Sequence, residues 1–290
     1  MTVLGAVSLP QISPERSAAA AAAAEDSGLD ELWLWEDCFW GGGIATAATI
    51  LARTEQIRVG IGVMPVPLRN VALTAMEVAT LLRLHPGRVI PGFGHGVQDW
   101  MGQVGARVES PMTLLREHLA ALRDLLGGEK VSTTGRYVRL DDVALDWPPT
   151  APPLLAAAAT GPQTLRLSGE LADATILTSR TTPGGVRAAR TLIDEGRANA
   201  RRTEPHRVIV YLLAATGPDA AGRLAAAQRR NTDDHPPEAG VAGDAEAIAD
   251  AVRHFAAAGA DTVVLEPTDD DPDLIEFVRF AGAEVRPLLN

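Results

Sequence analysis

The sequence contains a single cysteine, Cys38, among its 290 residues. One cysteine cannot form an internal disulfide or a C-x-x-C metal or redox motif, and its isolation is typical of proteins kept in a reducing compartment. We therefore expect a cytoplasmic protein in which no metal ion is bound by cysteine.

Basic residues are too few to balance the acidic ones. The chain has 26 Lys+Arg against 37 Asp+Glu, which gives a formal net charge of −11. A net negative charge opposes the attraction to phosphate groups that supplies most of the affinity of nucleic-acid-binding proteins. We therefore expect neither DNA nor RNA to be a partner.

Long hydrophobic runs are also missing. The most conspicuous apolar run, residues 18–24, is flanked by charged residues and is much too short to span a bilayer. No basic segment precedes it, so we expect neither a signal peptide nor association with a membrane.

Several motifs of well-known catalytic sites do not occur. The sequence has no H-E-x-x-H, no cluster of histidine and acidic residues at metal-ligand spacing, and no G-x-S-x-G nucleophile elbow. We expect no metal site and no serine hydrolase, so an organic cofactor would have to supply the difficult chemistry.

Short apolar segments and amphipathic helical segments alternate along the chain. Strands are predicted at residues 3–9, 30–35, 57–63, 88–90, 154–159, 174–177, 207–214 and 262–265, with helices between them. About eight strands is the number that closes a parallel barrel, although a doubly wound open sheet also alternates in this way. The length and the strand count favour a single α/β domain, residues 1–290, folded as a (β/α)8 TIM barrel. A small hairpin insertion is predicted at 130–140 and a polar loop at 231–241.

The stretch from residue 86 to 105 is rich in glycine. Gly92, Gly94 and Gly96 are spaced G-x-G-x-G after the fourth strand, unlike the G-x-G-x-x-G of a dinucleotide-binding fold. Glycines allow the backbone to approach a ligand closely, but the same composition is typical of a simple connection. His95 lies between two of them, where proton transfer, cofactor contact and solvent exposure all remain open.

Residues that follow strand ends are the candidates for a site, because the loops after the carboxyl ends of the strands build the catalytic face of such barrels. Asp37 can act as a base or cap the turn before Gly41. Residues 160–163 open a helix whose free N–H groups suit a phosphate, to which Thr178 can add a hydroxyl. The alternative is an ordinary helix start with Thr160 as its N-cap.

Four segments carry a resemblance to a known family. They read R-V-I-P-G-F-G-H-G-V-Q-D-W-M-G-Q-V-G (88–105), T-L-L-R-E-H-L-A-A-L-R-D-L-L (113–126), A-T-G-P-Q-T-L-R-L-S-G-E-L-A-D-A-T-I-L (159–177) and A-G-A-D-T-V-V-L-E-P (258–267). Together they resemble the bacterial-luciferase-like superfamily. Within it they are similar to the branch that uses the deazaflavin coenzyme F420, typified by methylenetetrahydromethanopterin reductase.

The resemblance implies a barrel that is often dimeric and binds a flavin-like ring at the carboxyl ends of its strands, with the phosphate near the fifth and sixth. It also implies a cis peptide bond that does not involve proline, near residues 62–64. Relatives often have Asp-His after the second strand, whereas this chain has Asp37 and Cys38. We predict Asp37 and His95 as catalytic residues and a cofactor-binding set of Cys38, Gly62, Val63, Met64, Gly94, Thr160, Gly161, Pro162, Gln163 and Thr178.

The resulting hypothesis is an F420-dependent oxidoreductase that transfers a hydride between the cofactor and a small organic substrate. An FMN-dependent monooxygenase using reduced flavin and oxygen is the alternative, and a cofactor-binding relative without catalysis is a third reading suggested by Cys38. A homodimer is expected from the family. The substrate and the direction of hydride transfer stay open, because the loops that line the pocket determine them.

Overall fold

A computed structural model describes residues 2–231 and 236–289 of the chain. Eight parallel strands form a closed barrel, in the order in which they occur along the chain. They are β1 (Val3–Ser8), β2 (Glu31–Leu34), β3 (Arg58–Pro65), β4 (Val89–Gly94), β7 (Ala156–Ala158), β8 (Ala174–Leu177), β9 (Arg207–Ala215) and β11 (Thr262–Pro267). Because β8 pairs with β9 and β11 pairs with β1, the sheet has no free edge within the barrel. The predicted TIM barrel is confirmed.

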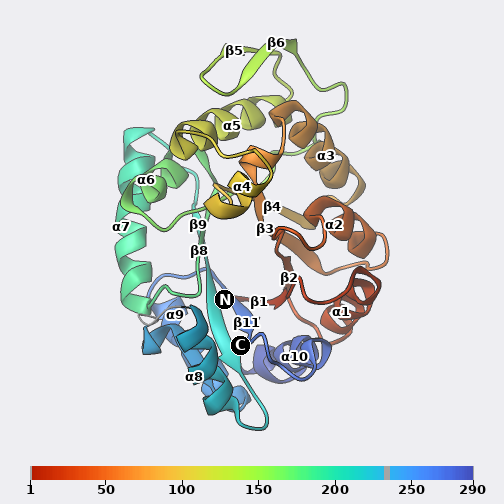
Figure 1. Cartoon of the computed structure of the whole chain (residues 1–290), viewed down its shortest axis with the longest axis vertical. Coiled ribbons are helices and arrows are strands. Elements are labelled where there is room, and N and C mark those ends of the chain that lie inside the picture. The colour runs from red at the N-terminus through yellow and green to blue at the C-terminus, as the bar shows by residue number, and fades with distance from the viewer. Residues whose placement is uncertain (1, 232–235, 290) are drawn as a thin grey trace.

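Helices surround this barrel (Figure 1). They are α1 (Pro14–Asp26), α2 (Gly43–Leu51), α3 (Val71–Leu84), α5 (Pro111–Leu126), α6 (Pro162–Leu171), α7 (Pro183–Asn199), α8 (Ala220–Asn231), α9 (Ala245–Ala257) and α10 (Leu274–Phe280). A π-helical turn (Ala281–Val285) and a 3-10 turn (Arg286–Leu289) follow α10.

Alternate residues of each strand face opposite sides of the barrel wall. Val263 and Leu265 of β11 pack outward in the large core between the barrel and the helices. Val264 packs inward with Val7 and Trp33 in a second cluster that fills the barrel. The interior is therefore a packed core, and space for a ligand exists only near the strand ends.

The predicted hairpin is confirmed as β5 (Val131–Thr134) and β6 (Arg139–Val143), which lie outside the helix ring beside α5 (Figure 1). Glu117 of α5 holds its turn, because its carboxylate accepts hydrogen bonds from the backbone N–H groups of residues 136, 137 and 138 at 2.8–2.9 Å.

Three local predictions need correction. Gly92 and Gly94 belong to strand β4 and not to a loop; a Cβ at Gly92 would lie 2.5 Å from the Ile61 carbonyl oxygen, so glycine is needed for close strand packing. The loop that follows contains an unpredicted helix, α4 (Gln98–Gln103), too short to show helical periodicity. In the predicted loop 231–241, residues 232–235 lie outside the described residues, and the rest includes a 3-10 turn (Pro237–Ala239) and the start of β10 (Gly240–Ala242), which pairs with β9.

No helix in the described residues combines the length and the apolar character needed to cross a membrane.

Candidate functional site

Two cavities lie at the carboxyl ends of the barrel strands and meet at Ala159 and Thr160. The first, which we call the β4 cavity, has a volume of about 210 Å³ and is lined by residues at or just after the carboxyl ends of β2, β3, β4 and β7. The second, which we call the β8 groove, has a volume of about 680 Å³ and is lined by the starts of α6 and α7 and the loop after β8. Because the two cavities share Ala159 and Thr160 as lining residues, they adjoin and together make up the candidate site.

Only some of the site residues predicted from the sequence line these two cavities. Of the twelve predicted site residues, Asp37, Val63, Gly94, His95 and Thr160 line the β4 cavity. Thr160, Pro162 and Thr178 line the β8 groove. Cys38, Gly62, Met64, Gly161 and Gln163 line neither.

His95 is held at the mouth by a tight turn after β4. The Gln98 side-chain amide donates to the backbone carbonyls of His95 and Gly96 at 3.1 and 3.2 Å. Gly96 has a φ of +68°, and a Cβ there would lie 2.9 Å from Pro65, so the turn requires glycine. The Nδ1 atom of His95 is buried and has no hydrogen-bond partner within the described chain. His95 thus lines the β4 cavity with one ring nitrogen buried and unpaired.

Burial lowers the pKa of His95, and a hydrogen bond with the backbone of Pro111 acts in the opposite direction. A lowered pKa keeps the imidazole neutral at physiological pH, so one ring nitrogen can accept and the other can donate.

Asp37 is half-buried, and its carboxylate forms no hydrogen bond or ion pair within residues 2–231 and 236–289. Burial raises its pKa. The alternative role of capping the following turn belongs instead to Glu36, which accepts a hydrogen bond from the Gly43 N–H at 2.6 Å and is paired with Arg69. Asp37 is thus free to interact with a ligand in the β4 cavity.

Cys38, Gly62 and Met64 do not line either cavity, whereas Val63 between the last two lines the β4 cavity. The predicted cis peptide bond is confirmed between Gly62 and Val63, and a second one joins Cys38 to Phe39. The space in front of Gly62 is filled by the Tyr211 hydroxyl, which donates to the Gly62 carbonyl at 3.2 Å. Met64 is buried in the core between the barrel and the helices. Burial, together with the charges of Asp37 and Glu36, raises the pKa of the Cys38 thiol.

Helix α6 begins at the β8 groove without a capping side chain. Its N-cap residue is Gly161, with φ of −92° and ψ of 157°, so the alternative of a Thr160 cap is wrong. The Thr160 side chain lines both cavities instead. An uncapped helix start beside a groove that also presents Thr178 and Arg180 has the donors that an anionic group prefers.

Sequence reasoning missed residues on the strands that close the barrel. Tyr211 of β9 packs edge-on against Trp33 and Trp35, with ring centroids 6.1 and 5.7 Å apart. Glu266 of β11 is buried at the same end of the barrel. The period of two along β11 offered a signal, since Glu266 shares the inward face with Val264. The site residues predicted from strand ends extend only as far as the sixth strand.

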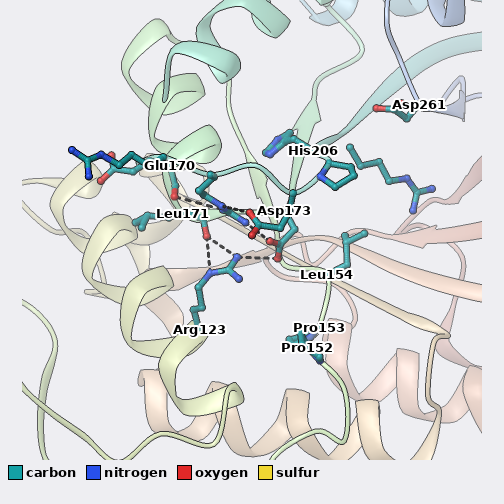
Figure 2. A pocket seen from close by; sticks show the side chains of 14 residues that line it. Arg123, Pro152, Pro153, Leu154, Glu170, Leu171, Asp173, His206 and Asp261 are labelled. Atoms are coloured by element: carbon teal, nitrogen blue, oxygen red, sulfur yellow. Dashed lines mark hydrogen bonds and ion pairs between the residues drawn. The ribbon is translucent and has the colours of Figure 1, made fainter. Parts of the chain in front are cut away.

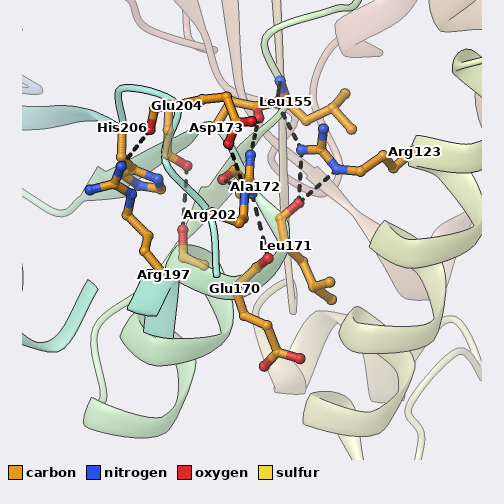
Figure 3. A network of polar contacts seen from close by, with 12 residues as sticks. Arg123, Leu155, Glu170, Leu171, Ala172, Asp173, Arg197, Arg202, Glu204 and His206 are labelled. Atoms are coloured by element: carbon orange, nitrogen blue, oxygen red, sulfur yellow. Dashed lines mark hydrogen bonds and ion pairs between the residues drawn. The ribbon is translucent and has the colours of Figure 1, made fainter. Parts of the chain in front are cut away.

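A further cavity, of about 900 Å³, lies at the opposite end of the barrel, at the amino-terminal ends of β7, β8 and β9 (Figure 2). Asp173 stands between Arg123 and Arg202, with N–O distances of 2.9 and 2.5 Å (Figure 3). Both arginines also donate to carbonyl oxygens at the end of α6, Leu171 and Ala172. Because these charges are paired with one another, they stabilise the fold at this end of the barrel.

Among the described residues, no three His, Cys, Asp or Glu side chains come together in a group suited to a metal ion.

The fold and the position of the site define a (β/α)8 barrel with its candidate site at the carboxyl edge. The family model for luciferase-like monooxygenases matches residues 2–232. The chain belongs to this family.

Two curated relatives and one solved structure show how similar the chain is to known members. It is 32% identical over 208 residues to 5,10-methylenetetrahydromethanopterin reductase of Methanolobus tindarius, which covers 71% of this chain and 63% of that protein. It is 30% identical over 188 residues to the F420-dependent glucose-6-phosphate dehydrogenase of Nakamurella multipartita, covering 61% and 56%. The matches thus span less than two thirds of either relative.

The coenzyme F420-dependent tetrahydromethanopterin reductase from Methanopyrus kandleri superposes with a TM-score of 0.85 over 100% of this chain and 99% of that one, at 21% identity. This likeness supports the fold.

Proposed function

We propose that this protein is a coenzyme F420-dependent oxidoreductase that acts on a small organic substrate. The observation that carries the proposal is the pair of adjoining cavities at the barrel mouth, one lined by His95 and Asp37 and the other by an uncapped helix start. The curated relative named for F420 dependence supports the choice of cofactor.

The residues present fit such a coenzyme. Thr160, Pro162 and Thr178 would hold its phosphate-bearing part along the β8 groove, while Val63, Gly94 and His95 would contact its ring in the β4 cavity. When bound, the coenzyme supplies or accepts a hydride. The neutral imidazole of His95 can donate or accept one hydrogen bond there, and Asp37 can hold a proton at its carboxyl oxygen.

A fluorescence titration with oxidised F420, run in parallel with FMN, tests the cofactor. We expect saturable F420 binding, weakened about tenfold or more by Thr160→Tyr, because the larger side chain would obstruct the junction of the two cavities. The matched control is Thr191→Tyr on the exposed side of α7, which should bind as the unmodified protein does.

Tight FMN binding with oxygen consumption would instead establish the FMN-dependent monooxygenase alternative. The description of the family as luciferase-like monooxygenases is consistent with that alternative. Cofactor binding without turnover of any substrate would favour the non-catalytic reading suggested by Cys38.

We also propose a homodimer. Helix α3 exposes three large apolar side chains, Leu73, Met76 and Leu84, which are 48%, 59% and 68% exposed. Exposed apolar patches on one helix are typical of association surfaces. The single cysteine supports a cytoplasmic location for this assembly.

Light scattering of purified protein measures the assembly state directly. We expect the unmodified chain to have the mass of a dimer and Met76→Glu to shift it toward the monomer, because a charge would be desolvated at the interface. Thr191→Glu on α7 introduces the same charge away from α3 and should remain dimeric. A monomeric unmodified protein would contradict the proposed dimer.

A further inference from the structure

The wall of the β4 cavity is largely apolar. Six of the residues that line it have apolar side chains: Val63, Pro65, Val97, Trp100, Ala158 and Ala159. The polar side chains are two acids, one histidine and two threonines, and among the described residues that line the cavity there is no lysine or arginine. A phosphate or carboxylate group on a bound molecule would therefore find no cationic partner in this wall.

The two acids in the wall, Glu36 and Asp37, make an anionic ligand still less favourable. Glu36 is neutralised by Arg69, whose Nη2 atom lies 3.0 Å from its carboxylate. Arg69 does not line the cavity and also pairs with Glu77, at an N–O distance of 3.4 Å. The carboxylate of Asp37 has no partner in the described part of the chain, so when ionised it would repel a second negative charge in the cavity.

Large apolar side chains are exposed at and beside the cavity. Val97 lines the cavity and is 48% exposed, and Trp100 lines it while half-buried. On the loop after β2, Phe39 and Trp40 are 64% and 58% exposed. They lie within one turn of Asp37, because the Trp40 N–H donates to the Asp37 carbonyl oxygen at 2.9 Å. Exposed apolar surface next to a cavity is typical of a site that binds an apolar molecule.

Trp100 is held in place by its neighbours and is not part of the packed core. It belongs to α4, which lies inside the ring of outer helices (Figure 1). The adjacent Met101 is fully buried, and Arg107 donates from Nε to the Gln98 carbonyl oxygen at 2.9 Å. Because these contacts anchor α4 through residues other than Trp100, the half-buried indole can serve as a surface for a ligand.

We propose that the substrate is an uncharged molecule with a largely apolar body, that this body packs against Trp100 and Val97, and that phosphorylated or carboxylated molecules are rejected. The inference rests on the proposed function, which assigns Val63, Gly94 and His95 to the coenzyme ring and leaves the α4 side of the cavity to the substrate. Trp100 would contribute to affinity through the apolar area that it buries with the substrate.

Ligand-observed NMR titrations with three cyclohexanols test the substrate class. The three carry an isopropyl, a carboxylate or an ammonium group at C4 and are similar in size. We expect 4-isopropylcyclohexanol to bind the F420-loaded protein at least about tenfold more tightly than either charged compound, because only its substituent can be desolvated against the apolar wall without a counter-charge. Equal or tighter binding of the carboxylate or the ammonium compound would overturn the proposal, as would the lack of saturable binding of 4-isopropylcyclohexanol.

A substitution of Trp100 tests the contact with the apolar body. Trp100→Ala should weaken the binding of 4-isopropylcyclohexanol by about tenfold, because it removes the largest apolar side chain of the cavity wall. The matched control is Trp147→Ala, which removes an indole that is 71% exposed and does not line the cavity. If the two variants bound this compound equally well, Trp100 would not contact the substrate.

A cation added to the wall should change the selectivity. Val97→Lys should tighten the binding of 4-hydroxycyclohexanecarboxylate by about tenfold, because lysine supplies the missing partner for the carboxylate. Val104→Lys adds the same charge at a position that is 46% exposed and does not line the cavity, so it should bind as the unmodified protein does. Equal binding of the carboxylate by the two lysine variants would contradict the argument from charge.

Titrations with and without F420 separate this inference from the proposed function. A protein that binds no F420 in the fluorescence titration contradicts the proposed function, and the three cyclohexanols titrated against the protein alone then still show whether the cavity prefers an uncharged ligand. A protein that binds F420 and prefers the carboxylate contradicts this inference alone.

Discussion

Replacing Glu31 with glutamine is expected to lower the free energy of unfolding by about 3 kcal/mol, the largest loss we predict for a single side chain. Glu31 is fully buried at the amino-terminal end of the barrel. Its carboxylate pairs with Arg58 at 3.2 Å and with Arg207, and it accepts a hydrogen bond from the Trp33 indole N–H at 3.0 Å.

Most of the expected loss of stability comes from leaving the arginines unpaired, and less comes from removing the acid itself. Arg207 is mostly buried, so removal of the Glu31 charge leaves a guanidinium in a poorly hydrated environment. Urea unfolding at neutral pH measures the effect. Glu55→Gln, an exposed change on the α2–β3 connection, should stay within about 0.5 kcal/mol of the unmodified protein. A Glu31→Gln protein as stable as that control would show that the buried ion pairs contribute no net stability.

The second large effect is expected at Gly62, where alanine should cost about 3 kcal/mol through overpacking. A Cβ at this position would lie 2.2 Å from the Tyr211 hydroxyl oxygen and 3.1 Å from the Trp33 ring. Both aromatic side chains are buried, so neither can move away without disturbing the packing inside the barrel.

A double-mutant cycle identifies the clashing group. Tyr211→Phe removes the hydroxyl, and with it the hydrogen bond to the Gly62 carbonyl, at an expected cost of about 1 kcal/mol. In that background Gly62→Ala should cost at least about 1 kcal/mol less than in the unmodified protein. Gly184→Ala near the start of α7, where no atom lies closer than 3.6 Å to the added Cβ, is the matched control. If the free-energy costs of Gly62→Ala and Tyr211→Phe were simply additive, the clash would not involve the Tyr211 hydroxyl.

These experiments concern the wall of the candidate site. Tyr211 fills the space in front of Gly62, and the adjoining Val63 lines the β4 cavity. A Gly62→Ala protein that still folds should therefore also bind F420 more weakly, which the fluorescence titration used for the cofactor can measure.

The candidate site divides into residues that the sequence could predict and residues that it could not. Asp37, His95 and Thr160 follow predicted strand ends, and the barrel architecture brings them to one edge, where they line the β4 cavity. Glu266 and Tyr211 lie within apolar strands, so their inward orientation depends on which strand face the barrel encloses. The glycines at 62 and 92 suggested a ligand, whereas tertiary packing shows that a protein atom occupies the space of each missing Cβ.

The sequence by itself determined the alternation of strands and helices, the order of the βα units and the family to which the chain belongs, because these depend on short-range periodicity and on local motifs. Only the tertiary structure decided that β8 pairs with β9 to close the barrel, that the two cavities meet at Thr160, and that Glu266 is buried without a cation. Closure of the barrel, the shape of the cavities and the burial of side chains arise from contacts between residues far apart in the chain. Local sequence patterns do not determine such contacts.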